Sequence, residues 1–367
     1  MWRCFFLILN LTLLFSCSST KDEDVQEFSV SLLSNVNVEQ LICEADEIVL
    51  DIGEDHLISN VDKICDDKQY LYILDRRQAV IYLYNHEGKF ISKISRKGRS
   101  NNEYVAIDDI DVFEGYIYVL DSASKKIIGY DKSGEVVKTI NLNDWYQNLS
   151  VTSDRILLYS ERSNYQKKDI VIINHAGDVI SEYLPFDKYE GTTYRTSPFN
   201  RTSDGNYYLT FPYEGRIFFL TDSGCDCVMS LSVPDYKVYS DDEVTEMSYE
   251  GLRNAGFDYD AMRRIKSISS KDGKMFMIIS AFHKKYGIRD TIILIDAKSG
   301  SYKSYLIGSE ISSSYPYLTN LLSTSGDIIY SSVDPLRIKH IREIIGEEVS
   351  QGEIMSNPTI FLYKINW

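Results

Sequence analysis

Basic side chains recur in short clusters along a chain that is otherwise strongly acidic. The formal net charge is −15, from 54 acidic and 39 basic residues. Arginine presents a planar fork of N–H donors that fits a carboxylate, sulfate or phosphate. The candidate set, with two neighbouring residues, is Arg76, Arg77, Arg99, Glu103, Tyr104, Lys167, Lys168, Lys284 and Arg289. These residues predict an anion-binding surface if the fold brings them together, and chance placement of cations in exposed loops is the alternative.

Oxygen-bearing side chains form a second candidate set. Its members, each near the expected start of a strand, are Asp62, Asp108, Asn148, Asn200 and Asn320. Carboxylate and amide oxygens that converge on one axis could hold Ca²⁺ and support metal-assisted hydrolysis. Solvated polar residues around a wet channel would give the same pattern without a metal. We therefore expect no cofactor and keep Ca²⁺ as the alternative.

Motifs of established catalytic centres are missing from the sequence. There is no His-Glu-x-x-His, no Gly-x-Ser-x-Gly, no phosphate-binding loop and no dinucleotide fingerprint. The cysteines beyond the N-terminal region, Cys43, Cys65, Cys225 and Cys227, match no zinc spacing, so thiols are expected and a disulfide stays open. The acidic balance argues against nonspecific binding to nucleic acid. These features favour a binding or scaffolding module over an enzyme.

A 46-residue internal repeat indicates the elements that position these side chains. Tyr72, Asp75, Tyr84, Gly88 and Ile94 recur as Tyr118, Asp121, Tyr130, Gly134 and Ile140. A period of this length, with alternating apolar positions and a Gly turn, is typical of a propeller blade of four antiparallel strands. The same turn recurs at residues 174–177, 221–224 and 296–300, which predicts five complete blades.

A sixth blade is expected from Asn320, with strands at Ile328 to Ser332 and Thr359 to Ile365. It lacks an outer strand, which Glu47 to Ile52 can supply, and this pairing would close the ring and remove exposed strand edges. We therefore expect an all-β fold, a single six-bladed β-propeller over residues 41–367 closed by an N-terminal strand. Two short helical insertions, near 234–264 and 333–357, are expected over the mouth of the ring.

The antiparallel order of a blade predicts where a ligand would bind. It places the connections between second and third strands, and those between successive blades, on one face. That face carries nearly every long segment and the basic clusters, whereas the opposite face has short Gly-centred turns. Because long loops on a rigid scaffold usually carry binding, a glycan or a partner protein is expected there.

The N-terminus has the pattern of an export signal. One basic residue precedes a short apolar run that ends in Leu-Phe-Ser-Cys at residues 14–17, which resembles a bacterial lipobox. We expect residues 1–16 to be a lipoprotein signal peptide, Cys17 to carry the lipid that anchors the protein to the membrane, and residues 17–40 to be a tether. An ordinary signal peptide is the alternative. Truncation as far as Val30 is expected to leave the propeller intact.

One segment between the first two blades resembles a known family. Residues 97–104, Lys-Gly-Arg-Ser-Asn-Asn-Glu-Tyr, look like the Lys-Gly-x-Gly-Pro-Gly-Glu-Tyr segment of six-bladed β-propeller lipoproteins of gut Bacteroidota, whose blades are similar to the NHL repeat. The resemblance covers the chain from about residue 40 onward, together with the lipobox. Ser100, Asn101 and Asn102 stand where that family has Gly, Pro and Gly, which puts any function of this loop in doubt.

The resemblance implies a location and leaves the reaction open. It implies an outer-membrane lipoprotein without assigned catalytic residues. The acidic run at residues 21–24 resembles the signal that sends such lipoproteins to the cell surface, and the periplasmic face is the alternative. The expected function is to bind an extracellular glycan or protein. A Ca²⁺-dependent hydrolase, similar to six-bladed lactonases and paraoxonases, is the alternative.

Overall fold

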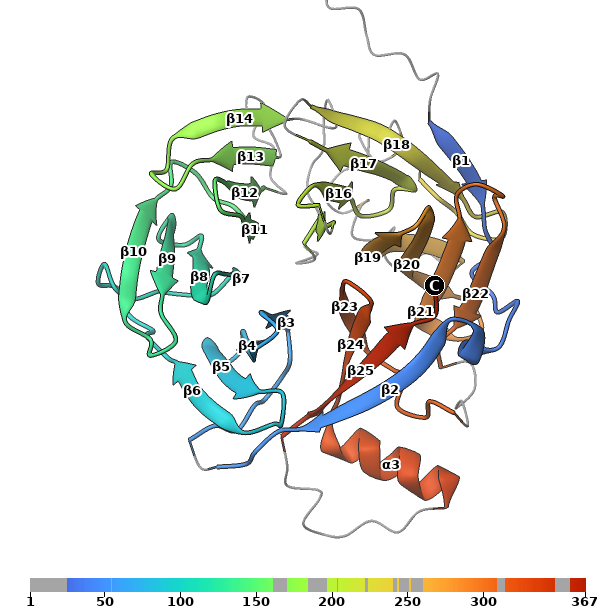
Figure 1. The fold of residues 1–367 in the computed structure, drawn as a ribbon, viewed down its shortest axis with the longest axis horizontal. Helices are drawn as coiled ribbons and strands as arrows, with labels where there is room; N and C mark the ends of the chain where they lie inside the picture. The colour runs from blue at the N-terminus through green and yellow to red at the C-terminus, as the bar shows by residue number, and fades with distance from the viewer. Residues whose placement is uncertain are drawn as a thin grey trace, which may run out of the picture.

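Six sheets stand in a ring, each with its first strand toward the centre and its last strand at the rim (Figure 1). This arrangement comes from a computed structural model. It describes residues 25–53, 55–160, 170–183, 197–202, 204–221, 224–239, 243, 251, 260–308, 314–346 and 357–367. The predicted six-bladed β-propeller is confirmed.

Each blade has four antiparallel strands, and in five of the six blades these four strands are consecutive in the sequence. Blade 1 contains β3 (Lys63–Asp66), β4 (Tyr70–Asp75), β5 (Val80–Asn85) and β6 (Phe90–Ile94). Blade 2 contains β7 (Asp109–Phe113), β8 (Tyr116–Asp121), β9 (Lys126–Tyr130) and β10 (Val136–Asn141). Blade 3 contains β11 (Asn148–Val151), β12 (Ile156–Tyr159), β13 (Ile170–Ile173) and β14 (Val179–Tyr183).

The remaining blades follow the same order, inner strand first. Blade 4 contains β15 (Phe199–Arg201), β16 (Tyr207–Thr210), β17 (Arg216–Leu220) and β18 (Cys225–Ser232). Blade 5 contains β19 (Ala261–Lys271), β20 (Lys274–His283), β21 (Gly287–Asp296) and β22 (Tyr302–Leu306). Blade 6 contains β23 (Leu321–Ser325), β24 (Ile328–Val333) and β25 (Thr359–Ile365), and its outer strand is β2 (Ile42–Val49).

The repeated residues stabilise the hairpin turns and the connecting segment that precedes each blade. Asp75 accepts the backbone N–H of Ser59 at 2.7 Å, and Asp121, 46 positions later, accepts that of Val105 at 2.8 Å. Both are fully buried, so each carboxylate ties a blade-to-blade connection to the end of a second strand. Gly88 and Gly134 have φ of 80° and 83°, a left-handed conformation that favours glycine. The repeat therefore encodes scaffold contacts.

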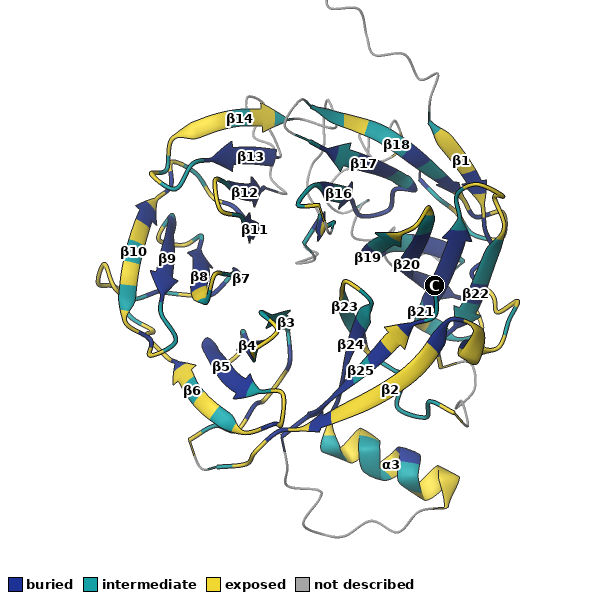
Figure 2. Cartoon of the chain, viewed as in Figure 1, coloured by how far each residue is buried: buried dark blue, intermediate teal, exposed yellow. Residues whose placement is uncertain are grey.

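The ring closes as expected through an antiparallel pair of β2 and β25. The register runs from Ile42 opposite Ile365 to Val49 opposite Thr359. The strand begins five residues earlier than the predicted Glu47 and ends at Val49. Most of its side chains are exposed, because it is the outermost strand of its blade and packs on one side only (Figure 2).

A strap over residues 26–41 precedes the closing strand. β1 (Gln26–Ser29) pairs in parallel with β18 as a fifth strand of blade 4, and the chain then runs along β22, where Ser304 Oγ donates to Leu33 O at 2.7 Å. Leu32 and Leu41 are fully buried. Residues from Gln26 onward, expected in the tether, thus pair and pack with the propeller, and truncation to Val30 would remove these contacts.

The hydrophobic core is divided among the interfaces between blades. In the described part of the chain, six clusters of buried side chains each join two adjacent blades. Strand residues alternate between the two faces of a sheet, and both faces of a blade meet a neighbour, so middle strands such as β5 are buried along most of their length (Figure 2). The strap contributes Phe28, Val30 and Leu32 to the interface of blades 4 and 5.

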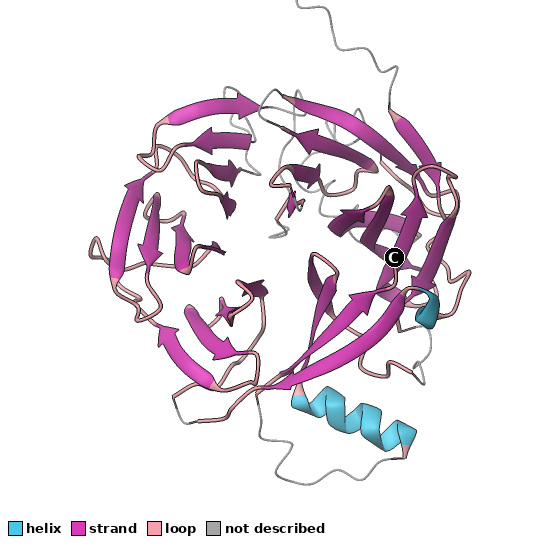
Figure 3. Cartoon of the chain, in the orientation of Figure 1, coloured by secondary structure: helices cyan, strands magenta, loops and turns pink. Residues whose placement is uncertain are grey.

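One of the two expected helical insertions forms a helix within the described residues. α3 (Pro335–Ile345) begins at Asp334, whose carboxylate accepts from Arg337 N at 2.9 Å, and ends at Gly346 with φ of 83°. It lies beside blade 6 at the rim, so the expectation that it covers the mouth is wrong (Figures 1 and 3). The other insertion falls mostly outside the described residues. No described helix is both long and apolar enough to cross a membrane.

Candidate functional site

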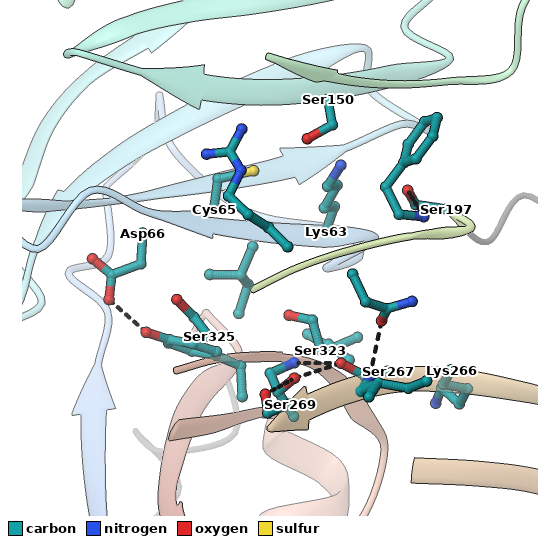
Figure 4. A pocket seen from close by; sticks show the side chains of 18 of the residues that line it. Lys63, Cys65, Asp66, Ser150, Ser197, Lys266, Ser267, Ser269, Ser323 and Ser325 are labelled. Atoms are coloured by element: carbon teal, nitrogen blue, oxygen red, sulfur yellow. Dashed lines mark hydrogen bonds between the residues drawn. The ribbon is translucent and has the colours of Figure 1, made fainter. Parts of the chain in front are cut away.

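A cavity of about 1060 Å³ lies at the centre of the ring (Figure 4). All six inner strands, β3, β7, β11, β15, β19 and β23, contribute side chains to its wall. Its size is at the upper end of ordinary ligand pockets, which are about 300–1,000 Å³. Such pockets are mostly apolar, whereas this wall is rich in charged and hydroxyl groups. A ligand that fills it would need many polar groups.

The wall carries more positive than negative residues on a strongly acidic protein. Its seven basic residues are Lys63, Lys68, Arg76, Arg201, Arg264, Lys266 and Lys271. Its five acidic residues are Asp62, Asp66, Asp109, Asp111 and Asp327. Because the whole chain has a net charge of −15, the cavity differs in sign from the rest of the molecule.

A buried carboxylate supports the cations of blade 1. Lys63 Nζ donates to Asp109 Oδ1 at 2.9 Å and to Ile110 O at 2.7 Å, and Arg76 lies 3.8 Å from the same carboxylate. The side chain of Lys63 is 24% exposed and that of Asp109 only 1%. Burial alone would lower the pKa of Lys63, but the nearby negative groups, Asp109 foremost, and the hydrogen bond to Asp109 together outweigh burial, so the pKa lies above its usual range. The cation therefore faces the cavity with its counter-ion behind it.

A second ion pair repeats this arrangement between blades 2 and 4. Arg201 lies 3.8 Å from Asp111, with side chains 35% and 19% exposed. Asp111 also accepts from Val151 N at 2.7 Å and from Ser150 Oγ at 3.1 Å, which fixes its position. Burial lowers the pKa of Arg201, but Asp111 and Tyr207 together raise it by more, and the guanidinium stays charged.

The inner strands are also joined to one another by hydrogen bonds from backbone and side-chain amides. Asp109 Oδ2 accepts from Leu149 N at 3.1 Å and from Asn148 Nδ2 at 3.2 Å. Asn200 Oδ1 accepts from Ile268 N at 2.9 Å, which joins blades 4 and 5. These bonds hold the wall rigid, so its polar groups are arranged before any ligand enters.

Hydroxyl groups cover the side of the cavity formed by blades 5 and 6. The serine and threonine residues of the whole wall are Ser150, Ser197, Thr202, Ser267, Ser269, Ser270, Ser323, Thr324 and Ser325. Ser269 Oγ donates to Thr324 Oγ1 at 2.9 Å, and Ser267 bonds to the same threonine, which links β19 to β23 (Figure 4). Phe199, half-buried on β15, adds an aromatic ring to the wall.

Four of the five candidate oxygen ligands, Asp62, Asn148, Asn200 and Asn320, line the cavity, and Asp108 does not. Asp62 accepts the backbone N–H of Arg76 at 2.8 Å, and Asp108 accepts that of Ser122 at 2.9 Å. These carboxylates thus fix the turns after second strands. Among the residues that the structure describes, no three His, Cys, Asp or Glu side chains are close enough to share a metal.

The basic candidates divide between the cavity and the loops around it. Arg76 lines the cavity, while Arg77, Arg99 and Lys284 are exposed in loops. Arg289 lies on β21, where it donates to Ile288 O at 2.8 Å. Lys167 and Lys168 lie outside the described residues, as does Cys17. A role of these residues in ligand binding stays a prediction.

The two other candidates of that set have internal partners. Tyr104 is fully buried, and its hydroxyl donates to Ala79 O at 2.8 Å and accepts from Arg96 N at 3.0 Å. Glu103 accepts from Ser100 N at 2.9 Å. The resemblance segment is therefore a folded loop held by its own Glu and Tyr, which leaves little of either side chain for a ligand.

The described cysteines, Cys43, Cys65, Cys225 and Cys227, are free thiols. Cys65 lies in the cavity wall, where burial raises its pKa to about 12. It is therefore a neutral thiol at neutral pH and a weak nucleophile.

Lys63, Arg201 and Lys266 are cavity residues that the sequence did not reveal. The repeat held a usable signal for the first, since Lys63 and Asp109 are 46 positions apart and so occupy equivalent sites on adjacent inner strands. Opposite charges at such sites predict a pair. Arg201 and Lys266 belong to blades in which the repeat is poorly kept, so no comparable signal exists.

Comparison with known proteins supports the fold. Residues 24–364 match the family model described as "Domain of unknown function (DUF4934)". Among proteins with curated descriptions, none matches the chain significantly.

Two solved structures from Bacteroides are similar over nearly their whole length. A "Putative exported protein" from Bacteroides fragilis superposes with a TM-score of 0.73 at 18% identity, over 93% of this chain and 99% of that one. A member of the DUF4221 family from Bacteroides vulgatus superposes with a TM-score of 0.59 at 11% identity, over 89% and 97%. At these identities the similarity shows a common fold.

Proposed function

The chain belongs to the DUF4934 family, and we propose that it is an exported lipoprotein whose propeller binds an extracellular anionic ligand, a glycan or a partner protein. The lipid would be attached at Cys17 and would hold the protein at the outer membrane. Export is supported by the name of the B. fragilis relative and by the lipobox at residues 14–17. No part of this function requires a metal or a nucleic acid.

The observation that supports the proposal most strongly is the excess of basic over acidic residues in the wall of the central cavity. Seven basic residues against five acidic ones line the cavity of a protein with a net charge of −15. Arg77 and Arg99 add exposed cations in the loops outside the cavity. A positive site on a negative protein favours an anionic ligand. Charges beyond about 8 Å are screened at physiological salt, so only closely grouped cations contribute to binding.

The test measures binding of acidic and neutral glycans to the full chain in detergent at several salt concentrations. We expect affinity for acidic glycans that falls as salt rises, because exposed charges are screened. Reversal of Arg77 and Arg99 to Glu should weaken binding. The matched control reverses Lys89 and Lys298, which are exposed on turns of the opposite face. Equal effects of the two reversals, or binding indifferent to salt, would contradict the proposal.

A further inference from the structure

The cationic side of the cavity keeps hydrogen-bond donors free for a ligand. Lys63 has three N–H donors and uses two of them, on Asp109 and Ile110. Arg201 has five, and its bonds inside the described part of the chain go to Tyr207 and Val151, with Asp111 at 3.8 Å. Asp111 acts electrostatically on both Lys63 and Arg201, so the two cations belong to one group.

The inner strands of blades 5 and 6 offer hydroxyl groups that are still available. Ser270 on β19 and Ser323 and Ser325 on β23 line the cavity, and their side chains form no hydrogen bond with other described residues. A serine hydroxyl can both donate and accept, so it suits a ligand hydroxyl of either orientation. These serines share the cavity with Lys63 and Arg201, and its volume can hold a ligand of more than one ring.

An aromatic ring also lines the cavity, on the same strand as Arg201. Phe199 begins β15, two residues before Arg201, and packs its edge against Tyr207 with ring centroids 6.0 Å apart. It remains partly exposed toward the cavity. The apolar face of a sugar ring packs on such a side chain, while the hydroxyls around the ring require polar partners.

We propose that the central cavity binds an acidic oligosaccharide, with a sugar carboxylate on Lys63 and Arg201, ring hydroxyls on the serines of β19 and β23, and a sugar ring against Phe199. This inference rests on the proposed function and narrows it to one ligand class and one location. The carboxylate takes the spare donors of the cations, and the buried Asp109 and the half-buried Asp111 keep those cations in place. A neutral sugar would offer these spare donors no charged acceptor.

The experiment compares two disaccharides of the same ring and linkage. Titration calorimetry on the full chain in detergent measures binding of α-1,4-linked digalacturonate and of α-1,4-linked galactobiose, which differ in the carboxylates at C6. We expect digalacturonate to bind at least about tenfold more tightly, the effect of one charge-assisted hydrogen bond. Inorganic sulfate serves as a third probe and should bind more weakly than digalacturonate, because it meets the cations alone.

Two substitutions place the ligand in the cavity. Arg201→Gln should weaken digalacturonate binding by roughly 10- to 100-fold, and Ser323→Ala by roughly 2- to 10-fold. Lys298→Gln, on an exposed turn of the opposite face, is the matched control and should leave affinity unchanged. A thermal melt of each variant separates loss of binding from loss of fold. If Arg201→Gln unfolds the protein, Ser323→Ala, which removes only one hydroxyl group, still tests the site.

The outcomes separate this inference from the proposed function. Binding of digalacturonate that Arg201→Gln and Ser323→Ala leave intact, while reversal of Arg77 and Arg99 abolishes it, would overturn the cavity site and keep the loop-face function. Equal binding of both disaccharides, or sulfate as tight as digalacturonate, would overturn the acidic-sugar assignment. Absence of binding to every acidic glycan would overturn both.

Discussion

Substitution of Gly88 and of Gly134 by alanine tests how the ring is closed. The two glycines occupy the same turn of blades 1 and 2, with φ of 80° and 83°. Their surroundings differ. A Cβ at Gly88 would lie 2.0 Å from Val49 O at the end of the closing strand β2, whereas a Cβ at Gly134 would lie 3.7 Å from Ile94 Cγ1. The pair thus separates the cost of the backbone conformation from the cost of contact with β2.

The expected magnitudes follow from these distances. A left-handed backbone costs a residue other than glycine about 1–2 kcal/mol, which is the whole effect expected for Gly134→Ala. Gly88→Ala adds a collision with backbone that cannot rotate away, worth about 1–3 kcal/mol more. Gly88 O also accepts from Asp51 N at 2.8 Å, so a shift of the turn would strain that bond as well.

Urea unfolding followed by circular dichroism measures the difference. We expect Gly88→Ala to lose about 2–5 kcal/mol of unfolding free energy and Gly134→Ala about 1–2 kcal/mol. Because unfolding entropy near 60 °C is about 2.1 cal/mol/K per residue, each kcal/mol lowers the melting temperature of so long a chain by only about 1–2 °C. Equal losses in the two variants would show that β2 does not lie against the blade 1 turn, and the closure of the ring would need another explanation.

Four further predictions concern the anchor, the strap, the metal and the cavity. Cys17→Ala should move the protein from the membrane fraction to the soluble fraction and abolish palmitate incorporation; protease treatment of intact cells then distinguishes the surface from the periplasm. Leu32→Ala should cost about 2–4 kcal/mol in urea unfolding, since the side chain is fully buried between blades 4 and 5, and a loss below about 1 kcal/mol would contradict that packing. The melting temperature should be indifferent to calcium and to chelator, whereas a calcium-dependent rise would favour the hydrolase alternative. The pKa of Lys63 is raised in the folded state, because Asp109 and the other nearby negative groups together outweigh burial. The stability that the charged Lys63 contributes is therefore present below the ordinary lysine pKa of about 10.4 and is lost as pH rises above it. Lys63→Met should show a flatter loss of stability above about pH 10, and identical curves would contradict a charged Lys63.

The blade architecture could be predicted from sequence because its signals are local and repeated. Asp75 and Asp121 end their second strands in the same way, and Gly88 and Gly134 make the same turn. Each signal lies within a few residues of the bond it makes. The predicted strand Thr359 to Ile365 agrees with β25 in both bounds.

The strap could not be predicted because its partners are remote. β1 pairs with a strand some two hundred residues later, and its parallel register leaves no turn signal between the two. Four residues with one fully packed side chain, Phe28, are too few for a periodic pattern. Leu32 and Leu41 are buried by blades that the sequence places far downstream. Only the assembled ring shows that this stretch belongs to it.

The loop cations that the sequence singled out overlap little with the residues that line the cavity. The sequence drew attention to cations in loops, and of these Arg76 alone, among the residues described, lines the cavity. Other basic residues that line it, such as Lys63 and Arg201, lie on inner strands. They are recognised as site residues only through their ion pairs with Asp109 and Asp111. A cluster of basic residues in a loop can be read from the sequence. An ion pair between inner strands of two blades cannot, because it depends on how those strands are positioned relative to each other.

The two copies of the internal repeat have the same residues at positions that hold the scaffold and different residues at positions that line the cavity. At the end of the second strand, positions 75 and 121 are both Asp and make the same backbone contacts. On the inner strand, equivalent positions differ: Lys63 corresponds to Asp109, and Cys65 to Asp111. Since both copies have the same backbone, this difference changes only what the wall presents to the cavity. Because Lys63 and Asp109 occupy equivalent positions on β3 and β7, adjacent inner strands carry opposite charges that form an ion pair. This difference between the blades would give a ligand one preferred orientation in a nearly symmetric ring.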